Sequence, residues 1–267
     1  MKKLSLIVLA SLFSGILLAQ TIEISEAELK AQLDSVLVEA HLLYKYEKAA
    51  WISTDLAMGD QAIKNDFAGY LTYEKQGKIK VIILGKQSQN CIAEYSFGND
   101  FNKPESAKTK SRKTSNKEKK LIDIRTKIWS GIIDNKYAVA LPPDGFALNA
   151  ILIPVAKKYK FYIITGATLR NVIPYGNDYL FIVDKNGEIE NWQKFHSRLI
   201  PAETEVNGHK VNVAHSHLKT TPLITATDIC TFMLYAPLYD LDILSVFSPA
   251  IKKNMKYSLK EDKITVE

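Results

Sequence analysis

The spacing of apolar residues after residue 25 predicts a long amphipathic helix. Ser25 followed by Glu28 is a capping box, in which each side chain satisfies a free backbone N–H of the first turn. Apolar residues then recur three or four positions apart, which gives the helix one face for a core. These residues are Leu29, Leu33, Val36, Leu37, Ala40 and Leu43. The segment 49–55 follows, where we expect either a bend or a second helix starting at Ser53.

Strand patterns alternate with one further helix in the rest of the chain. Residues 70–73 and 79–84 flank Gln76-Gly77, which is typical of a hairpin turn, and 90–97 is a third strand. Residues 121–133 have helical spacing. After Pro142, Pro143 and Gly145 the pattern is nearly all strand, at 150–155, 161–165, 179–183 and 189–193. Asn186-Gly187 between the last two strands predicts a type I′ turn.

These elements predict an α/β fold with a β-rich C-terminal half. We place a boundary at residue 145, with an α+β portion over 21–145 and a second domain over 146–267. Residues 99–117, between the third strand and the second helix, contain almost no apolar residue and predict a flexible basic insert.

Residues 1–20 predict a secretion signal. Lys2 and Lys3 form its positive region, 4–18 its apolar region, and Ala19 a small residue at the cleavage position. The apolar run is shorter than the roughly 20 residues of a membrane-spanning helix. We expect a cleaved signal, no transmembrane segment afterwards and a bacterial protein that is periplasmic or secreted; an uncleaved anchor is the alternative.

Composition and charge change this picture little. The chain has 46% hydrophobic and 24% charged residues, as globular proteins do. The net charge of +6 falls to +4 without Lys2 and Lys3, and seven basic residues lie between Lys108 and Lys120. This run lacks interleaved aromatic residues, so we interpret it as a solvated loop and expect no nucleic-acid partner. The oligomeric state is left open.

The two cysteines leave two alternatives open. Cys91 and Cys230 could pair in an oxidising compartment, or both could be buried free thiols. Since there is no cysteine cluster, any metal site must use histidines and carboxylates.

Four of the five histidines fall within 22 residues: His196, His209, His215 and His217. His215 and His217 end a predicted strand, where residues two apart point to the same face. Asp228 lies in the first turn of the following predicted helix. Two imidazoles and one carboxylate would leave a fourth position open on a zinc ion, the arrangement of catalytic zinc sites. The alternative without metal is that Thr225 and Asp228 simply cap the helix.

The segment His215-Ser216-His217, seven residues, then Thr225-Ala226-Thr227-Asp228 resembles the signature of JAMM (MPN-type) metallopeptidases. The resemblance covers roughly residues 170–260. It implies that His215, His217 and Asp228 bind Zn²⁺, and that Thr225 replaces the serine that steadies the tetrahedral intermediate.

The family's general base is a glutamate at the start of the first hairpin strand, and this chain has no glutamate from 119 to 187. Asp178 aligns best with that position, although its side chain is one methylene shorter. We therefore expect either an exported zinc-dependent hydrolase of peptide or isopeptide-type amides, with Asp178 as base and a peptide or cell-envelope substrate, or an inactive JAMM-like binding module of the envelope, with or without metal.

Overall fold

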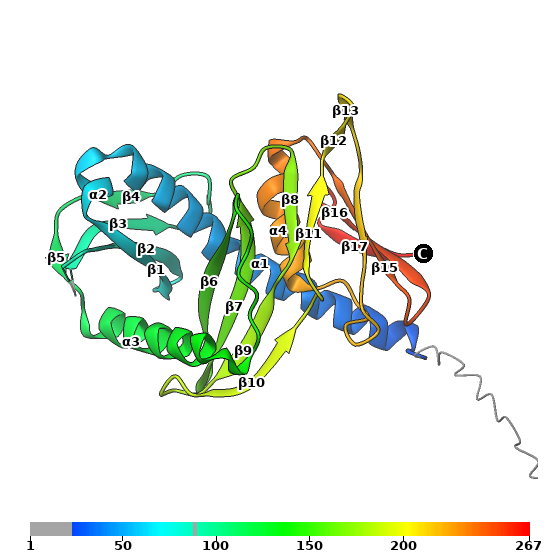
Figure 1. Ribbon diagram of the computed structural model, residues 1–267, viewed down its shortest axis with the longest axis horizontal. Coiled ribbons are helices and arrows are strands. Elements are labelled where there is room, and N and C mark those ends of the chain that lie inside the picture. The colour runs from blue at the N-terminus through cyan, green and yellow to red at the C-terminus, as the bar shows by residue number, and fades with distance from the viewer. Residues whose placement is uncertain (1–22, 88–89) are drawn as a thin grey trace, which may run out of the picture.

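The computed structural model describes residues 23–87 and 90–267, and Figure 1 shows their arrangement. The predicted signal at 1–20 lies outside the described residues. The helices are α1 (Glu26–Gly59), α2 (Gln61–Asp66), α3 (Asn116–Gly131) with a π-helical end (Ile132–Lys136), and α4 (Ala226–Tyr235) with a 3-10 turn (Ala236–Leu238). The strands are β1 (Phe67–Lys75), β2 (Lys78–Gly85), β3 (Asn90–Phe97), β4 (Ser106–Lys108), β5 (Arg112–Lys113), β6 (Phe146–Val155), β7 (Lys158–Ala167), β8 (Val172–Gly176), β9 (Tyr179–Val183), β10 (Ile189–Lys194), β11 (Leu199–Glu203), β12 (Glu205–Val206), β13 (His209–Lys210), β14 (Val213–Ser216), β15 (Ile243–Ser248), β16 (Lys253–Ser258) and β17 (Lys263–Val266).

The chain has the predicted α/β class, with strands dominating its C-terminal part. Helix α1 starts where the sequence predicts it, with the Ser25 hydroxyl accepting the Glu28 backbone N–H. It continues unbroken to Gly59, so no second helix starts at Ser53. In Figure 1 α1 runs the length of the molecule, from the sheet of β1–β5 to the sheet of β14–β17.

The basic stretch at 99–117 differs from the expected flexible insert. Its strands β4 and β5 both pair antiparallel with β3. The anchor is Arg112, whose guanidinium donates to Glu94 at 2.6 Å and to Glu118 at 2.8 and 2.9 Å. The prediction of a flexible insert was based on the lack of apolar residues. In the structure, strand pairing and the ion pairs of Arg112 anchor the stretch instead.

A second antiparallel sheet has the order β10-β9-β7-β6, and α3 packs on it through a cluster that includes Ile124, Phe161 and Phe181. The predicted hairpin of β9 and β10 is present, but its turn is not type I′. Only Gly187 has a positive φ (87°), while the Asp184 carboxylate accepts the backbone N–H groups of Asn186 and Glu188.

The third sheet carries the predicted strand with the two histidines. Its order is β14-β15-β16-β17, with β14 parallel to β15. Helix α4 packs against α1, and one continuous core joins residues from Leu29 to Tyr257. This core includes residues on both sides of position 145, so both predicted domains share it.

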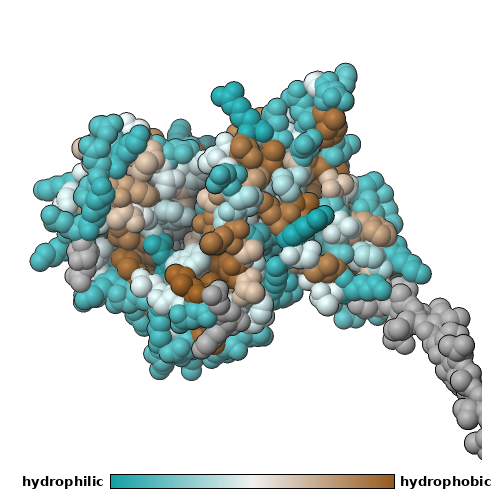
Figure 2. All heavy atoms as spheres, in the orientation of Figure 1, coloured by the Kyte–Doolittle hydropathy of each residue, from teal (hydrophilic) through white to brown (hydrophobic). Residues whose placement is uncertain are grey.

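The cysteines, the hydropathy of the helices and the surface complete the description of the fold. Cys91 and Cys230, both within the described ranges, are buried and unpaired, which confirms the free-thiol alternative. Within 23–87 and 90–267, no helix is both long enough and apolar enough to cross a membrane. On the face shown in Figure 2, hydrophobic residues gather over the middle of the molecule and hydrophilic residues cover its edges.

Candidate metal centre

Strand β14 presents two imidazoles to the same side, as the sequence predicts. His215 lies on the strand and His217 follows directly after it, with the His217 N–H donating to the Phe247 carbonyl at 2.9 Å. The parallel pairing with β15 thus extends through the second histidine. The two Nε2 atoms lie 3.2 Å apart.

Helix α4 brings the carboxylate. Thr225 is its N-cap, and Asp228 stands three positions on in a full capping box. Asp228 Oδ2 accepts the Thr225 backbone N–H at 2.9 Å and the Thr225 hydroxyl at 2.6 Å. The same oxygen lies 3.0 Å from His217 Nε2. Asp228 therefore completes the capping box and is also a proposed ligand, so the two sequence interpretations do not exclude each other.

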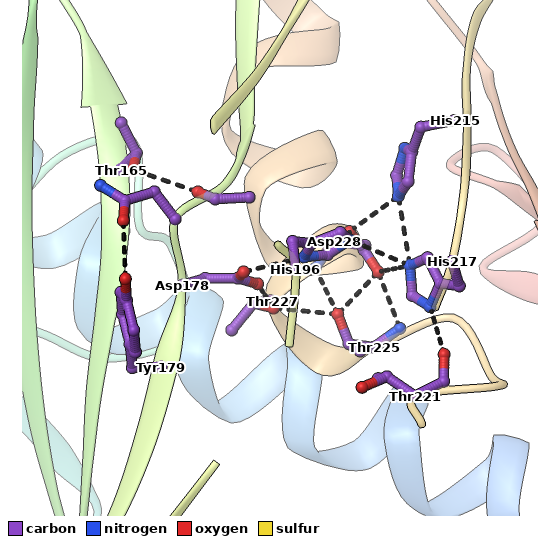
Figure 3. Close-up of polar contacts among 12 residues, drawn as sticks. Thr165, Asp178, Tyr179, His196, His215, His217, Thr221, Thr225, Thr227 and Asp228 are labelled. Atoms are coloured by element: carbon purple, nitrogen blue, oxygen red, sulfur yellow. Dashed lines mark hydrogen bonds and ion pairs between the residues drawn. The ribbon is translucent and has the colours of Figure 1, made fainter. Parts of the chain in front are cut away.

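A third histidine that we did not predict as a ligand completes the cluster. His196 follows β10, and its Nε2 lies 3.1 Å from His217 Nε2 and 3.4 Å from Asp228 Oδ1. The ligand atoms of His196, His215, His217 and Asp228 all lie within 4.8 Å of one another. Figure 3 shows these side chains gathered at the start of α4. The signal for His196 was the predicted hairpin itself, since pairing Tyr179 with Lys194 brings Asp178 beside residues 195 and 196.

Hydrogen bonds alone do not satisfy these four groups. His217 Nε2 has three polar neighbours at 3.0 to 3.2 Å, although a ring nitrogen carries one proton or one lone pair. Asp228 Oδ1 lies 3.1 Å from His215 Nε2, yet it forms no hydrogen bond with any described residue. Ligands of a tetrahedral zinc lie about 3.3 Å apart, given zinc–ligand distances of about 2.0–2.2 Å. A cation therefore fits this donor set.

The outer nitrogens of two histidines fix the tautomer that a metal requires. His196 Nδ1 lies 2.8 Å from Asp178 Oδ1, and His217 Nδ1 lies 3.0 Å from the Thr221 carbonyl oxygen. Both partners accept hydrogen bonds, so each Nδ1 is the donor and each Nε2 keeps its lone pair for the centre. His215 Nδ1 is buried and finds no partner within the described chain.

The charges of the cluster shift its pKa values strongly. Burial lowers the pKa of His196, but the carboxylates of Asp228 and Asp178 outweigh it and raise the pKa to about 9. Burial raises the pKa of Asp228, but the three imidazoles outweigh it and hold that pKa well below its usual range. Burial and the charge of Asp228 raise the pKa of Tyr175, whose ring packs on His215, so this phenol stays neutral.

The predicted catalytic residues lie beside the cluster, behind its ligands. Asp178 uses one oxygen on His196 Nδ1 and the other on the hydroxyl of Thr227. The Thr225 hydroxyl is engaged with Asp228 and with Thr227, 2.9 Å away. Both side chains thus hold ligands or the cap in place; their predicted roles in catalysis stay predictions.

Gly176 allows the backbone to place Asp178 at this position. Gly176, with φ 73°, ends β8 two residues before Asp178. A Cβ there would lie 2.2 Å from the Arg198 carbonyl oxygen and 3.2 Å from His196 Cβ. Only glycine permits the chain that carries Asp178 to pass so close to the loop that carries His196.

Water has little access to the cluster. The side chains of His196, His215, His217 and Asp228 are between 0% and 3% exposed.

No family model, curated protein or solved structure matches this chain. The resemblance to JAMM metallopeptidases therefore rests on the quoted residues and stays a prediction.

Proposed function

We propose that this chain is an exported zinc-binding protein whose metal centre is closed, with His196, His215, His217 and Asp228 as its four ligands. One observation carries the proposal: His196 Nε2 lies among the other three ligand atoms, where an open site would leave room for water or substrate. In this proposal the chain corresponds to the binding-module alternative rather than to the hydrolase.

The chemistry of the donor set supports a closed zinc site. Structural zinc sites are four-coordinate and tetrahedral, whereas catalytic sites use three protein ligands and keep one position open. The ion would supply a redox-inert link between the loop after β10, strand β14 and helix α4. Imidazoles also suit copper, iron and nickel. His217 Nε2 lies 3.0 to 3.2 Å from Asp228 Oδ2 and from the Nε2 atoms of the other two histidines, which is close to the ligand spacing of a tetrahedral zinc ion.

Burial supports the same proposal. A hydrolase of peptide or isopeptide amides must admit a polypeptide to the open position of its metal. Here the ligand side chains are almost fully covered, and both oxygens of Asp178 are occupied by hydrogen bonds. The hydrolase remains the competing proposal, supported by the spacing from His215 to Asp228.

Metal analysis of purified protein tests the proposal. We expect one zinc ion per chain, loss of most of the zinc in His196→Gln, and unchanged zinc in His209→Gln, a control on the exposed strand β13. Full zinc affinity in His196→Gln would show that three ligands suffice and would overturn the closed site. Amide hydrolysis by zinc-loaded wild type, abolished in Asp178→Asn, would establish the hydrolase instead.

A further inference from the structure

A cavity lies at the end of α4 opposite the proposed metal centre. It has a volume of about 260 Å³ and lies between α1, α4 and strands β1, β6 and β7. Exposed Ala147 and Thr168 lie on its rim, and Glu47 lies among its buried lining residues. None of the four proposed zinc ligands lines it.

Glu47 in this cavity is a buried carboxyl group with half of its hydrogen-bonding capacity unused. The residue is 4% exposed, and its Oε1 accepts the Asn149 amide N–H at 2.6 Å. Its Oε2 is buried and has no hydrogen-bond partner within the described chain. A buried carboxylate oxygen without a partner is costly, so a native protein is expected to offer it one.

The surroundings of Glu47 fit a cation. Among the described residues that line the cavity, Glu47 is the only charged one. Three aromatic residues form much of the wall: Trp51, Tyr70 and Tyr235. The rings of Trp51 and Tyr235 are tilted against each other with centroids 5.2 Å apart. Aromatic faces next to a carboxylate attract ammonium groups and pack on alkyl carbon.

The other polar and charged groups around the cavity do not partner the free oxygen of Glu47. Tyr235 Oη accepts the Ala167 backbone N–H at 2.7 Å. Two cations lie beside the cavity wall: Lys48 Nζ lies over the Trp51 ring, 5.5 Å from its centroid, and Arg125 stacks on Tyr70 and donates to the Tyr70 carbonyl. Neither forms a hydrogen bond with the free oxygen of Glu47. The unpaired charge is left for a ligand.

We propose that this cavity binds a small primary ammonium group, with the ammonium on Glu47 and its alkyl chain along Trp51 and Tyr235. The same chemistry is offered by a free alkylamine and by a lysine side chain of a peptide. The site is independent of the metal centre, so the two proposals can fail separately.

Titration by calorimetry with n-butylammonium tests the proposal, with 1-butanol as the neutral probe of equal length and Nα-acetyl-lysine amide as the peptide-like probe. We expect saturable binding of n-butylammonium, and at least tenfold weaker binding of 1-butanol. If acetyl-lysine amide also binds, the source can be a peptide; if it does not, the ligand is a free amine. No binding of n-butylammonium at millimolar concentration would overturn the proposal.

Two variants and one pH series make the test specific. Glu47→Gln keeps the shape of the side chain and should weaken n-butylammonium binding at least tenfold. Glu39→Gln, a carboxylate on the same helix that is paired with Lys160 outside the cavity, should leave it unchanged. Equal binding by wild type and Glu47→Gln would overturn the proposal.

The pH series uses wild-type protein and does not depend on how the variants fold. Burial raises the pKa of Glu47 to about 7, against the hydrogen bond from Asn149. The neighbouring titratable groups are Tyr70, Cys230 and Tyr235, and burial raises the pKa of each. The neighbouring cations are Lys48, which lies over Trp51, and Arg125, which packs on Tyr70, and burial lowers the pKa of both. Affinity for n-butylammonium should therefore rise about tenfold from pH 6 to pH 8. A flat profile would contradict the role of Glu47.

Discussion

At the scale of single residues, the proposed metal centre depends on side chains that are not among its ligands. Asp178 holds His196 through Nδ1, as the Thr221 carbonyl holds His217. Such partners fix the ring and its tautomer, and losing one typically weakens metal binding by about 10–100-fold. Asp178→Asn should therefore weaken zinc affinity by that factor, measured by competition with a chelator. If zinc affinity stayed at the wild-type level while an amidase activity disappeared, Asp178 would be a base rather than a positioning residue.

Glu47 makes a separate prediction about stability. Its folded pKa of about 7 lies above the usual 4.5, so folding favours its protonated form. This contribution is complete below pH 4.5, is lost as pH rises through 7, and then stays constant. Glu47→Gln imitates the protonated form. The free energy of unfolding of this variant should gain about 2–3 kcal/mol relative to wild type between pH 5 and pH 8, measured by urea unfolding at both values. An unchanged difference would mean that Glu47 finds a partner in the folded protein.

At the scale of elements, the start of α4 holds both a helix cap and one of the proposed metal ligands. Thr225 accepts the Asp228 backbone N–H at 3.2 Å and donates to the Asp228 carboxylate. Removing a helix N-cap costs about 1 kcal/mol. Thr225→Ala should therefore lower the melting temperature by about 2–4 °C, and Thr225→Ser, which keeps the hydroxyl, should restore it. Calorimetry of the two variants measures this. Equal melting temperatures for Thr225→Ala and Thr225→Ser would show that the hydroxyl contributes nothing.

The basic stretch at 99–117 also has one residue on which its order depends. Burial raises the pKa of Glu118, but hydrogen bonds from Arg112 and Tyr73 outweigh it and lower the pKa to about 2. Arg112→Gln leaves Glu118 without its cation, at a cost of about 2 kcal/mol, while Glu94 keeps Lys80 at 3.3 Å. We expect this variant to be cut faster by trypsin between residues 103 and 120, as read by mass spectrometry. Lys113→Gln, an exposed neighbour on the same strand, is the control and should be cut at the wild-type rate.

Local patterns predicted these elements well and the long-range contacts poorly. The start of α1, the strand 90–97 and the cap at Thr225 follow from neighbours within four residues, so sequence spacing contains the information. His215 and His217 were predicted to share a face for the same reason. Asp228 was predicted to join them from its place in the first turn of the next helix and from the resemblance to the JAMM signature. His196 was missed because it reaches the site only through the register of β9 with β10 and the close passage at Gly176. Arg112 was missed because its partners are 18 and 6 residues away.

At the scale of the whole molecule, the centre links three segments that the chain order keeps apart. His196 follows β10, His215 and His217 end β14, and Asp228 begins α4, which packs on α1 in the shared core. Without a cation, the buried charges and the three facing imidazoles must be accommodated by protonation alone. The proposed metal should therefore stabilise the whole fold, because both predicted domains contribute to the core around α1 and α4.

Removal of the metal tests this link. A ligand that binds only the folded state stabilises it by about 2.7 kcal/mol when its free concentration is 100 times the dissociation constant. For a chain of this size we expect the melting temperature to fall by about 5–10 °C after dialysis against a chelator, and to recover with one equivalent of zinc. His217→Gln should melt at the same lower temperature with or without zinc, whereas His209→Gln should respond like wild type. A melting temperature of wild type that is indifferent to both chelator and zinc would show that these four residues form a metal-free polar cluster.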